Sequence, residues 1–357
     1  MCNSLVALYF YRYNEHMSSF DEYKRTGEPD KKEKLGIWQT AIGLQDVDGL
    51  KPSAFLIETA KQNIDGKITI NDVKERLNSY YKTRNERKEG DRTEEADKVS
   101  AHIAEILAEK TFSFSPAGYV GIHRRLFTGI YKHAGAIRDY NITKDEWVLN
   151  GDTVYYASAV SIKETLDYDF ATEKKFDYRG LTIKQKVEHI ADFVSGVWQI
   201  HPFGEGNTRT TAVFMIKYMR LMGFTVSNDL FAEHSWYFRN ALVRANYNKH
   251  ITAAYPTMEF LLKFLGNLLL GEKNILRNRD MRIRTGNDDS GGNPIQTTVI
   301  EQEIINYIAV NPQATQDKIA KAVNKSPRTV KTIMQGLQDK GFIKRKGSKK
   351  TGKWEKG

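Results

Sequence analysis

The chain has 357 residues, of which 40% are hydrophobic, and its formal net charge is +10. This length and apolar content exclude a globally disordered chain and allow two or three domains. The single cysteine, Cys2, excludes a disulfide framework and any metal site built from several cysteines, so we expect a reducing, cytoplasmic location. No apolar run approaches the ~20 residues that a membrane span needs, and no membrane contact is expected.

The positive charge is concentrated at the end of the chain. Residues 296–357 contain 13 Lys and Arg against 5 Asp and Glu, whereas the preceding residues are nearly neutral. Such asymmetry indicates a nucleic-acid-binding appendage on a neutral body.

The first quarter of the sequence is a polar segment followed by short helical patterns. Residues 1–36 form a polar N-terminal segment, which we expect to be loose from Ser18 onward. Residues 37–92 carry helical patterns broken near Gly49 and end in a charged linker. The main domain is predicted over residues 93–272.

Helical periodicity returns at the start of this main domain, and Ser115-Pro116 marks a helix start. Residues 137–157 change character, because Asn150-Gly151 stands between two β-prone runs and favours a tight hairpin. Amphipathic helices are then predicted over 160–171, 182–199, 208–222, 234–248 and 256–271.

The nine residues from His201 to Arg209, in the order His-Pro-Phe-Gly-Glu-Gly-Asn-Thr-Arg, predict chemistry on a phosphate. A glycine-containing loop that enters a helix directs backbone amides and the helix dipole at an anion. Arg209 can hold phosphate oxygens with its fork of donors. Glu205 can hold a divalent metal, and the imidazole of His201 suits a general base.

These residues resemble the signature of the Fic family, His-x-Phe-x-(Asp/Glu)-Gly-Asn-x-Arg, at every fixed position. The resemblance implies a mainly α fold with a helical core and a β-hairpin flap. It also implies transfer of AMP from ATP to a Ser, Thr or Tyr hydroxyl of a protein, including this chain itself, with Mg²⁺ and release of pyrophosphate. His201 would be the base, and Glu205 would hold Mg²⁺. The nucleotide would be bound by Phe203, Gly204, Glu205, Gly206, Asn207, Thr208 and Arg209.

Two further segments take their expected roles from the same resemblance. In the flap, the target segment would dock by strand pairing, and the matching residues are Glu146, Trp147, Val148 and Leu149. A merely structural hairpin is the alternative, but a large aromatic such as Trp147 on an isolated hairpin favours a binding role. The stretch that contacts adenine would include Tyr237, Phe238 and Asn246, although helix packing explains the two aromatics equally well.

The sequence departs from the family pattern at two positions. Thr208 stands where many members have Gly, and since it is not Lys it argues against the family's kinase branch. Ala212 stands where many members have a second Arg that grips the γ-phosphate. The absence of this arginine removes a charge-assisted contact of about 1.5–3 kcal/mol, for which Lys217 or Arg220 are candidates to compensate.

Residues 41–52 resemble the small antitoxin module that inhibits many Fic proteins through the motif (Ser/Thr)-x-x-x-Glu-(Gly/Asn). The aligned positions are Leu44, Asp48 and Gly49. With Ala212 in place of the partner Arg, Asp48 has little to pair with. We therefore hypothesise a structural remnant, or a brake that works through another contact. An ordinary helix and turn is an equal alternative.

A linker, residues 273–296, leads to residues 297–357, which resemble a winged helix-turn-helix. Its wing strands would lie at 341–345 and 353–354. DNA is the expected partner, with protein contacts as the alternative. The recognition helix would carry its base contacts near its N-terminal end, at Arg328, Thr329, Lys331 and Thr332.

Two alternatives to AMP transfer remain open. The first is a DNA-binding regulator whose Fic-like domain only senses nucleotide, and the second is transfer of another nucleotide or phosphoryl group. The sequence names no target protein and leaves open whether the chain forms a homo-oligomer.

Overall fold

The computed structural model describes residues 29–83, 91–226, 229–248 and 255–283, and then residues 304–305, 307–308, 311–323, 330–331, 333–334, 337–338, 343–346 and 353–356. The chain divides into two compact units, Met1–Thr285 and Gly286–Gly357, each with its own apolar core. None of the helices in the described ranges has the length and apolarity of a bilayer-spanning segment.

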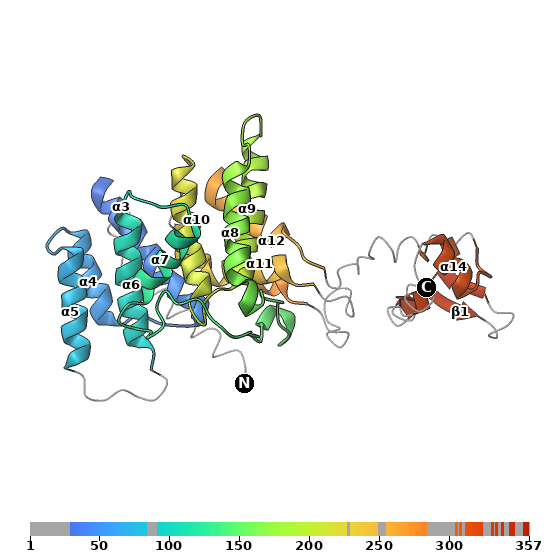
Figure 1. The fold of residues 1–357 in the computed structure, drawn as a ribbon, viewed down its shortest axis with the longest axis horizontal. Helices are drawn as coiled ribbons and strands as arrows, with labels where there is room; N and C mark the ends of the chain where they lie inside the picture. The colour runs from blue at the N-terminus through green and yellow to red at the C-terminus, as the bar shows by residue number, and fades with distance from the viewer. Residues whose placement is uncertain are drawn as a thin grey trace. The chain divides into compact units, whose positions relative to one another are not determined.

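The first unit is built from helices and short 3₁₀ helices, as Figure 1 shows, so the prediction of a mainly α fold is confirmed. Its elements are α3 (Pro29–Gly43), η1 (Leu44–Asp48), α4 (Ala54–Ile64), α5 (Ile70–Lys82), α6 (Thr93–Ala108), α7 (Pro116–Phe127), η2 (Trp147–Leu149), η3 (Ala159–Ser161), α8 (Ile162–Lys175), α9 (Ile183–Ile200), α10 (Asn207–Leu221), α11 (Asp229–Asn246), α12 (Glu259–Leu270) and η4 (Asn278–Met281), where η marks a 3₁₀ helix.

The centre of this unit is α10, whose side chains from Asn207 to Met219 are all buried. It packs against α6, α7 and α9, and in Figure 1 it stands between α7 and α9. One continuous apolar core runs from Leu35 to Met281. The segment predicted as antitoxin-like and the predicted main domain therefore share a single core.

Capping side chains set several helix starts. Ser115 Oγ accepts a hydrogen bond from Gly118 N, with Pro116 in the first turn of α7, as the sequence predicts. Thr182 forms a capping box with Gln185 at the start of α9. The N-terminal end of this helix is thus fixed, and its C-terminal end delivers His201.

Two segments that we expected outside the folded domains, one as a loose N-terminal segment and one as a linker, are partly ordered in the first unit. Helix α3 begins at Pro29, inside the polar N-terminal segment, because proline suits a first helical turn and Leu35 buries its side chain. In the predicted linker, η4 buries Met281, and Ile283 N donates to Val148 O. In both places burial of a few apolar side chains stabilises an ordered segment, although most of its residues are polar.

The predicted hairpin is reduced to a single bridge between Glu146 and Asp152. The chain does reverse at Asn150-Gly151, where both residues have positive φ. The residues before the turn form the 3₁₀ helix η2 and not a strand. The physical reason is that consecutive residues Val148 and Leu149 are both buried, whereas a strand alternates its side chains between two faces.

The second unit contains α14 (Gln316–Ala322) and the antiparallel strands β1 (Ile343–Lys346) and β2 (Lys353–Lys356). The predicted wing strands are therefore confirmed. Trp354 packs into the core and donates from Nε1 to Ala314 O. The third helix of this domain, which carries the recognition residues, is expected over 327–340, and the described residues in that range, 330–331, 333–334 and 337–338, are helical.

The close approach of α3 to α11 yields a testable consequence. A Cβ on Gly43 would lie 2.5 Å from Ala232 Cα and 2.8 Å from Phe231 O, and neither backbone can yield easily. We expect Gly43→Ala to destabilise the protein by about 1–3 kcal/mol through overpacking. The matched control is Gly121→Ala, in α7, where an added Cβ meets no atom within 4 Å.

This control variant should be more stable than the wild type by about 0.5–1 kcal/mol, since Ala is the better helix former. Urea unfolding of both variants measures the difference. Equal unfolding midpoints for the two variants would contradict the close packing of Gly43.

Candidate functional site

The nine motif residues form the connection from α9 into α10. His201 ends α9 with a φ of 50°, and Gly206 precedes α10 with a φ of 76°. A Cβ on Gly206 would lie 2.3 Å from ring atoms of Phe127. Both the backbone angle and the space therefore require glycine at this position.

Side chains within the motif close the loop on itself. Asn207 Oδ1 accepts from Phe203 N at 3.0 Å, and Asn207 Nδ2 donates to Phe203 O at 2.7 Å. The Phe203 ring is fully buried and stacks 3.7 Å from the His123 ring, whose Nε2 lies 3.1 Å from Glu205 O. Phe203 thus lies where an anchor of the loop is expected. His123, which carried no sequence signal, supports the loop from α7.

His201 is almost fully buried and lies against the rings of Tyr156 and Trp198. Its Nδ1 lies 3.1 Å from the Trp198 carbonyl oxygen. Because a carbonyl only accepts, Nδ1 carries the proton and Nε2 keeps its lone pair. Burial first, and then the charge of Lys144, hold the pKa of His201 well below its usual value, so the ring is neutral at pH 7.

Glu205 is the most open of the motif's charged side chains, with about half of its surface exposed. Its Oε2 lies 3.5 Å from Lys144 Nζ. Its neighbour Gly204 approaches Tyr140, whose hydroxyl would lie 2.6 Å from an added Cβ. Thr208 is buried, and its Oγ1 accepts from Trp198 Nε1. The carboxylate of Glu205 is therefore the motif group that faces solvent.

Arg209 lies in the core and not on the solvent side of the loop. Its side chain has no exposed surface, and its Nη2 lies 2.8 Å from Asp48 and 2.7 Å from Glu95. Its Nη1 donates to Gln45 Oε1 at 3.0 Å. Position 209 is on the flank of α10 that faces η1 and α6, so the guanidinium reaches protein carboxylates. The expected contact with phosphate would require the guanidinium to leave these partners.

The pair with Asp48 corrects the hypothesis that this carboxylate has little to pair with. Ala212 is indeed buried and uncharged, but Arg209 takes its place as the cation. Gly49 ends η1 with a φ of 67°. The antitoxin-like segment therefore contacts the motif through a different arginine from the one that the resemblance suggested.

Glu95 is the residue that sequence reasoning missed. It accepts hydrogen bonds from Arg92 and Tyr131 in addition to Arg209. Burial alone would raise the pKa of Glu95, but these donors outweigh it and lower the pKa. For Arg209, burial works to lower the pKa, and the surrounding charges, Asp48 foremost, raise it. No local pattern marks Glu95, since it lies 114 positions from its partner.

The two cations that were candidates to replace the missing arginine are committed elsewhere. Lys217 Nζ donates to the carbonyl oxygens of Ile106 and Glu109, and Arg220 Nη1 donates to Leu107 O. Both side chains thus cap the C-terminal end of α6. Neither compensates for Ala212 at the motif loop.

The expected docking residues are mostly inside the protein. Glu146 is buried, and its Oε2 lies 2.7 Å from Arg239 Nη1. Burial raises the pKa of Glu146, against the opposing effect of Arg239. Val148 and Leu149 belong to the core, and Trp147 remains partly exposed. Strand pairing along 146–149 is therefore not available in this conformation.

Two of the three candidates for adenine contact lie in the core, and the third, Asn246, is half-buried. Tyr237 and Phe238 are buried and pack against the ring of Phe264. Asn246 Nδ2 donates to Ser195 Oγ at 2.8 Å and to Leu242 O at 2.9 Å. Helix packing, the alternative interpretation, accounts for all three residues.

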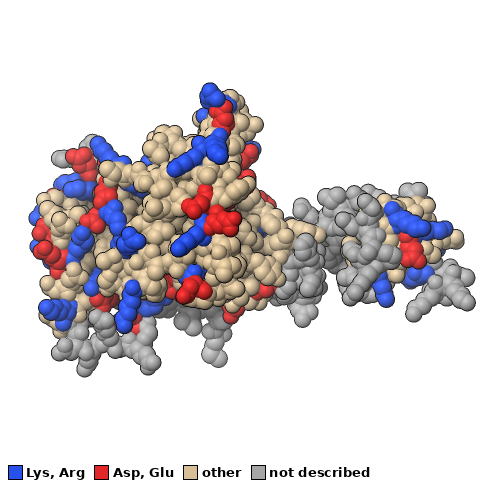
Figure 2. Space-filling model, viewed as in Figure 1, with Lys and Arg blue, Asp and Glu red and all other residues tan. Residues whose placement is uncertain are grey.

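Of the DNA-binding candidates, Arg328, Thr329 and Thr332 lie outside the described residues, and Lys331 is exposed. In the wing, Lys344, Arg345 and Lys346 are also exposed. In the first unit, Figure 2 shows Lys and Arg interspersed with Asp and Glu over the visible face. Exposed basic residues therefore mark the wing.

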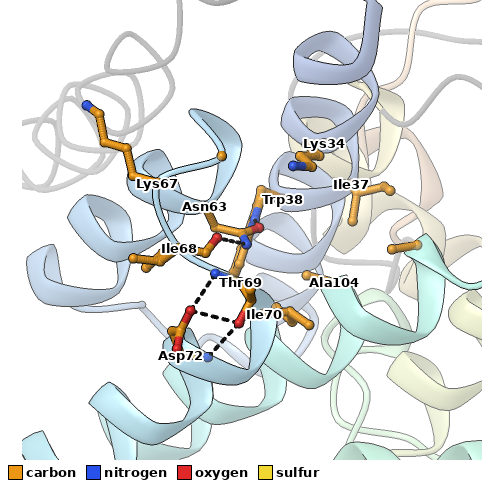
Figure 3. Close-up of a pocket in the computed structure, with 12 residues that line it drawn as sticks. Lys34, Ile37, Trp38, Asn63, Lys67, Ile68, Thr69, Ile70, Asp72 and Ala104 are labelled. Atoms are coloured by element: carbon orange, nitrogen blue, oxygen red, sulfur yellow. Dashed lines mark hydrogen bonds between the residues drawn. The ribbon is translucent and has the colours of Figure 1, made fainter.

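A cavity of about 380 Å³ lies away from the motif loop, between α3, the α4–α5 connection and α6. Figure 3 shows Trp38 at its wall, with Nε1 donating to Asn63 Oδ1. Asn63 in turn donates to Ile68 O, and Thr69 is bonded to Asp72. Most polar groups of the lining thus already have partners, and the rest of the wall is largely apolar.

Residues 113–219 match the Fic/DOC family, and residues 298–344 match the winged helix-turn-helix DNA-binding family. A protein adenylyltransferase, VbhT, from Bartonella schoenbuchensis is 29% identical over 108 residues, which are 30% of this chain and 21% of that protein. The match therefore spans about a fifth of the relative's length.

Two solved structures are also similar. A Fic family protein from Desulfovibrio desulfuricans has a TM-score of 0.44 and 13% identity, covering 100% of this chain and 97% of its own. The N-terminal Fic domain of a Bartonella effector protein has a TM-score of 0.39 and 19% identity, covering 48% of this chain and 78% of its own.

Proposed function

Since residues 113–219 form a Fic/DOC domain, we propose that this chain transfers AMP from ATP to a Ser, Thr or Tyr hydroxyl of a protein and releases pyrophosphate. The observation that carries the proposal is the state of His201. It is buried and neutral, its Nδ1 is held by Trp198 O, and its Nε2 is left as a base. A group that only senses nucleotide needs no such base.

In the proposed reaction the hydroxyl oxygen of the target attacks the α-phosphorus. Its proton moves to His201 Nε2, and the bond from the α-phosphorus to the bridging oxygen breaks, so that pyrophosphate leaves. The loop at the start of α10 supports this step, because its amides and the helix dipole favour the negative charge of the phosphate.

A magnesium ion fits the groups at the loop. Glu205 offers an exposed carboxylate, and among the residues that the structure describes no cluster of three or more His, Cys, Asp or Glu side chains gathers as a metal site. Mg²⁺ is commonly held by one or two carboxylates together with substrate phosphates and water. Bound through Glu205, it would neutralise charge on the phosphates of ATP.

We expect radioactive label from [α-³²P]ATP, but not from [γ-³²P]ATP, to appear on protein in the presence of Mg²⁺, and His201→Ala to abolish it. ATP binding should persist in the variant, since only the base is lost. Because the pKa of His201 lies below 6.5, the rate should not fall between pH 8 and 6.5 through protonation of this ring.

Label from the γ-phosphate would instead indicate phosphoryl transfer. ATP binding without any label, in the presence of candidate targets, would favour the nucleotide-sensing regulator. If His201→Ala fails to fold, His201 is needed for folding, and loss of the label would no longer support a catalytic role.

We further propose that Asp48 restrains this activity by holding Arg209. Asp48 competes with phosphate for the guanidinium, since both are anions. Asp48→Asn keeps the shape of the side chain and removes its charge, and we expect AMP transfer to rise tenfold or more. The matched control is Asp46→Asn, which removes a carboxylate from the same 3₁₀ helix.

The rate of α-label transfer measures the effect, with the unfolding midpoint recorded for each variant. A rate within twofold of the wild type, in a folded variant, would leave Asp48 with a structural role only.

A second function, DNA binding, is favoured by the winged helix-turn-helix match and by the exposed Lys344, Arg345 and Lys346 on β1. We expect the affinity for duplex DNA, measured by fluorescence anisotropy, to fall as salt rises. If each lysine contacts one phosphate, the double variant Lys344→Ala/Lys346→Ala should reduce the slope of log affinity against log salt by about 2. An unchanged slope would exclude phosphate contacts by these two lysines.

A further inference from the structure

Three cations act on His201, and two of them are bound to groups of the protein itself. The charges of Lys144, Arg239 and Arg138 all lower the pKa of the ring, after burial. Arg138 donates to the backbone carbonyls of His201, Tyr140, Ala157 and Ile200. Arg239 is paired with the buried carboxylate of Glu146. These two guanidiniums hold the fold around the base.

Lys144 differs from both arginines in its surroundings. Its side chain is 27% exposed, and its Nζ lies 3.5 Å from Glu205 Oε2, on a side chain that is 49% exposed. Its backbone N donates to Thr153 Oγ1 at 3.1 Å, which helps to hold the main chain beside the loop. A pair as open as this contributes little to stability and can be exchanged easily.

The cations within the motif and along α10 are not available in the same way. Arg209 has no exposed surface and is paired with Asp48 and Glu95. Lys217 and Arg220 cap α6. Of the cations named here, Lys144 is therefore the one that lies beside Glu205 on a partly exposed side chain.

We propose that Lys144 is a phosphate-binding residue of this site, which exchanges Glu205 for phosphate oxygens when a nucleotide enters. The proposal rests on the proposed function, because it assigns a residue to the same nucleotide site. The exchange is balanced in charge. Lys144 moves from one anion to another, and the carboxylate that it leaves becomes available to a divalent cation.

This assignment gives the segment before η2 a role in substrate recognition. A nucleoside without phosphate has nothing for Lys144 to bind, whereas a triphosphate carries several anionic oxygens. The residue would therefore select for the phosphate chain and contribute little to recognition of the base or sugar. It supplies positive charge at a loop whose own arginine is buried.

The test is calorimetric titration with magnesium and α,β-methylene ATP, in which the bond broken by AMP transfer is replaced, and with adenosine as the phosphate-free probe. Lys144→Ala should weaken binding of the triphosphate tenfold or more, and Lys144→Arg by less than threefold. The matched control is Lys184→Ala, an exposed lysine at the opposite end of α9, about 25 Å from His201.

Triphosphate affinity within twofold of the wild type in Lys144→Ala would overturn the proposal. So would an equal loss of adenosine affinity, because that would indicate a damaged site. The titration involves no transfer, so the two proposals can fail separately. If Lys144→Ala binds the triphosphate normally and the wild type transfers AMP, only the role of Lys144 is removed. If Lys144→Ala loses triphosphate binding and the wild type transfers no AMP, only the proposed reaction is removed.

Discussion

The burial of Arg209 between two carboxylates is the constraint on which the arrangement of the first unit depends. Asp48 reaches it from η1 and Glu95 from α6, while the arginine itself belongs to the central helix α10. A charge without exposed surface is costly unless it is paired, and loss of the cation that both carboxylates share is strongly destabilising. Electrostatics therefore ties the N-terminal helices to the helix that follows the motif.

Local features of this fold could be predicted from the sequence. The start of α7 at Ser115-Pro116 follows from capping chemistry, and the turn into α10 follows from Gly206 and Asn207. The partners of Arg209 could not be predicted, because hydrogen bonds to Gln45 and Glu95 span 164 and 114 positions. The motif identifies which side chains are present, whereas tertiary packing determines the direction in which each of them points.

The segment around Asn150 shows why a correct local signal can lead to a wrong element. Asn-Gly does produce the reversal, but the conformation of the flanking residues is set by burial in the core and by the ion pair with Arg239. The pairing of Glu146 with Arg239 and the burial of Val148 hold the chain in a 3₁₀ turn. A strand preference of the order of 1 kcal/mol cannot compete with such burial.

The position of Arg209 also affects how genetic data on this chain are to be interpreted. A screen that scores loss of function will recover substitutions at this position, as it would for a residue that touches substrate. We expect such alleles to lower the amount of folded protein, because they leave Asp48 and Glu95 without their shared cation. Protein abundance in the cell, measured alongside the phenotype, separates alleles of this kind from those at the exposed Glu205, where activity can be lost while abundance is kept.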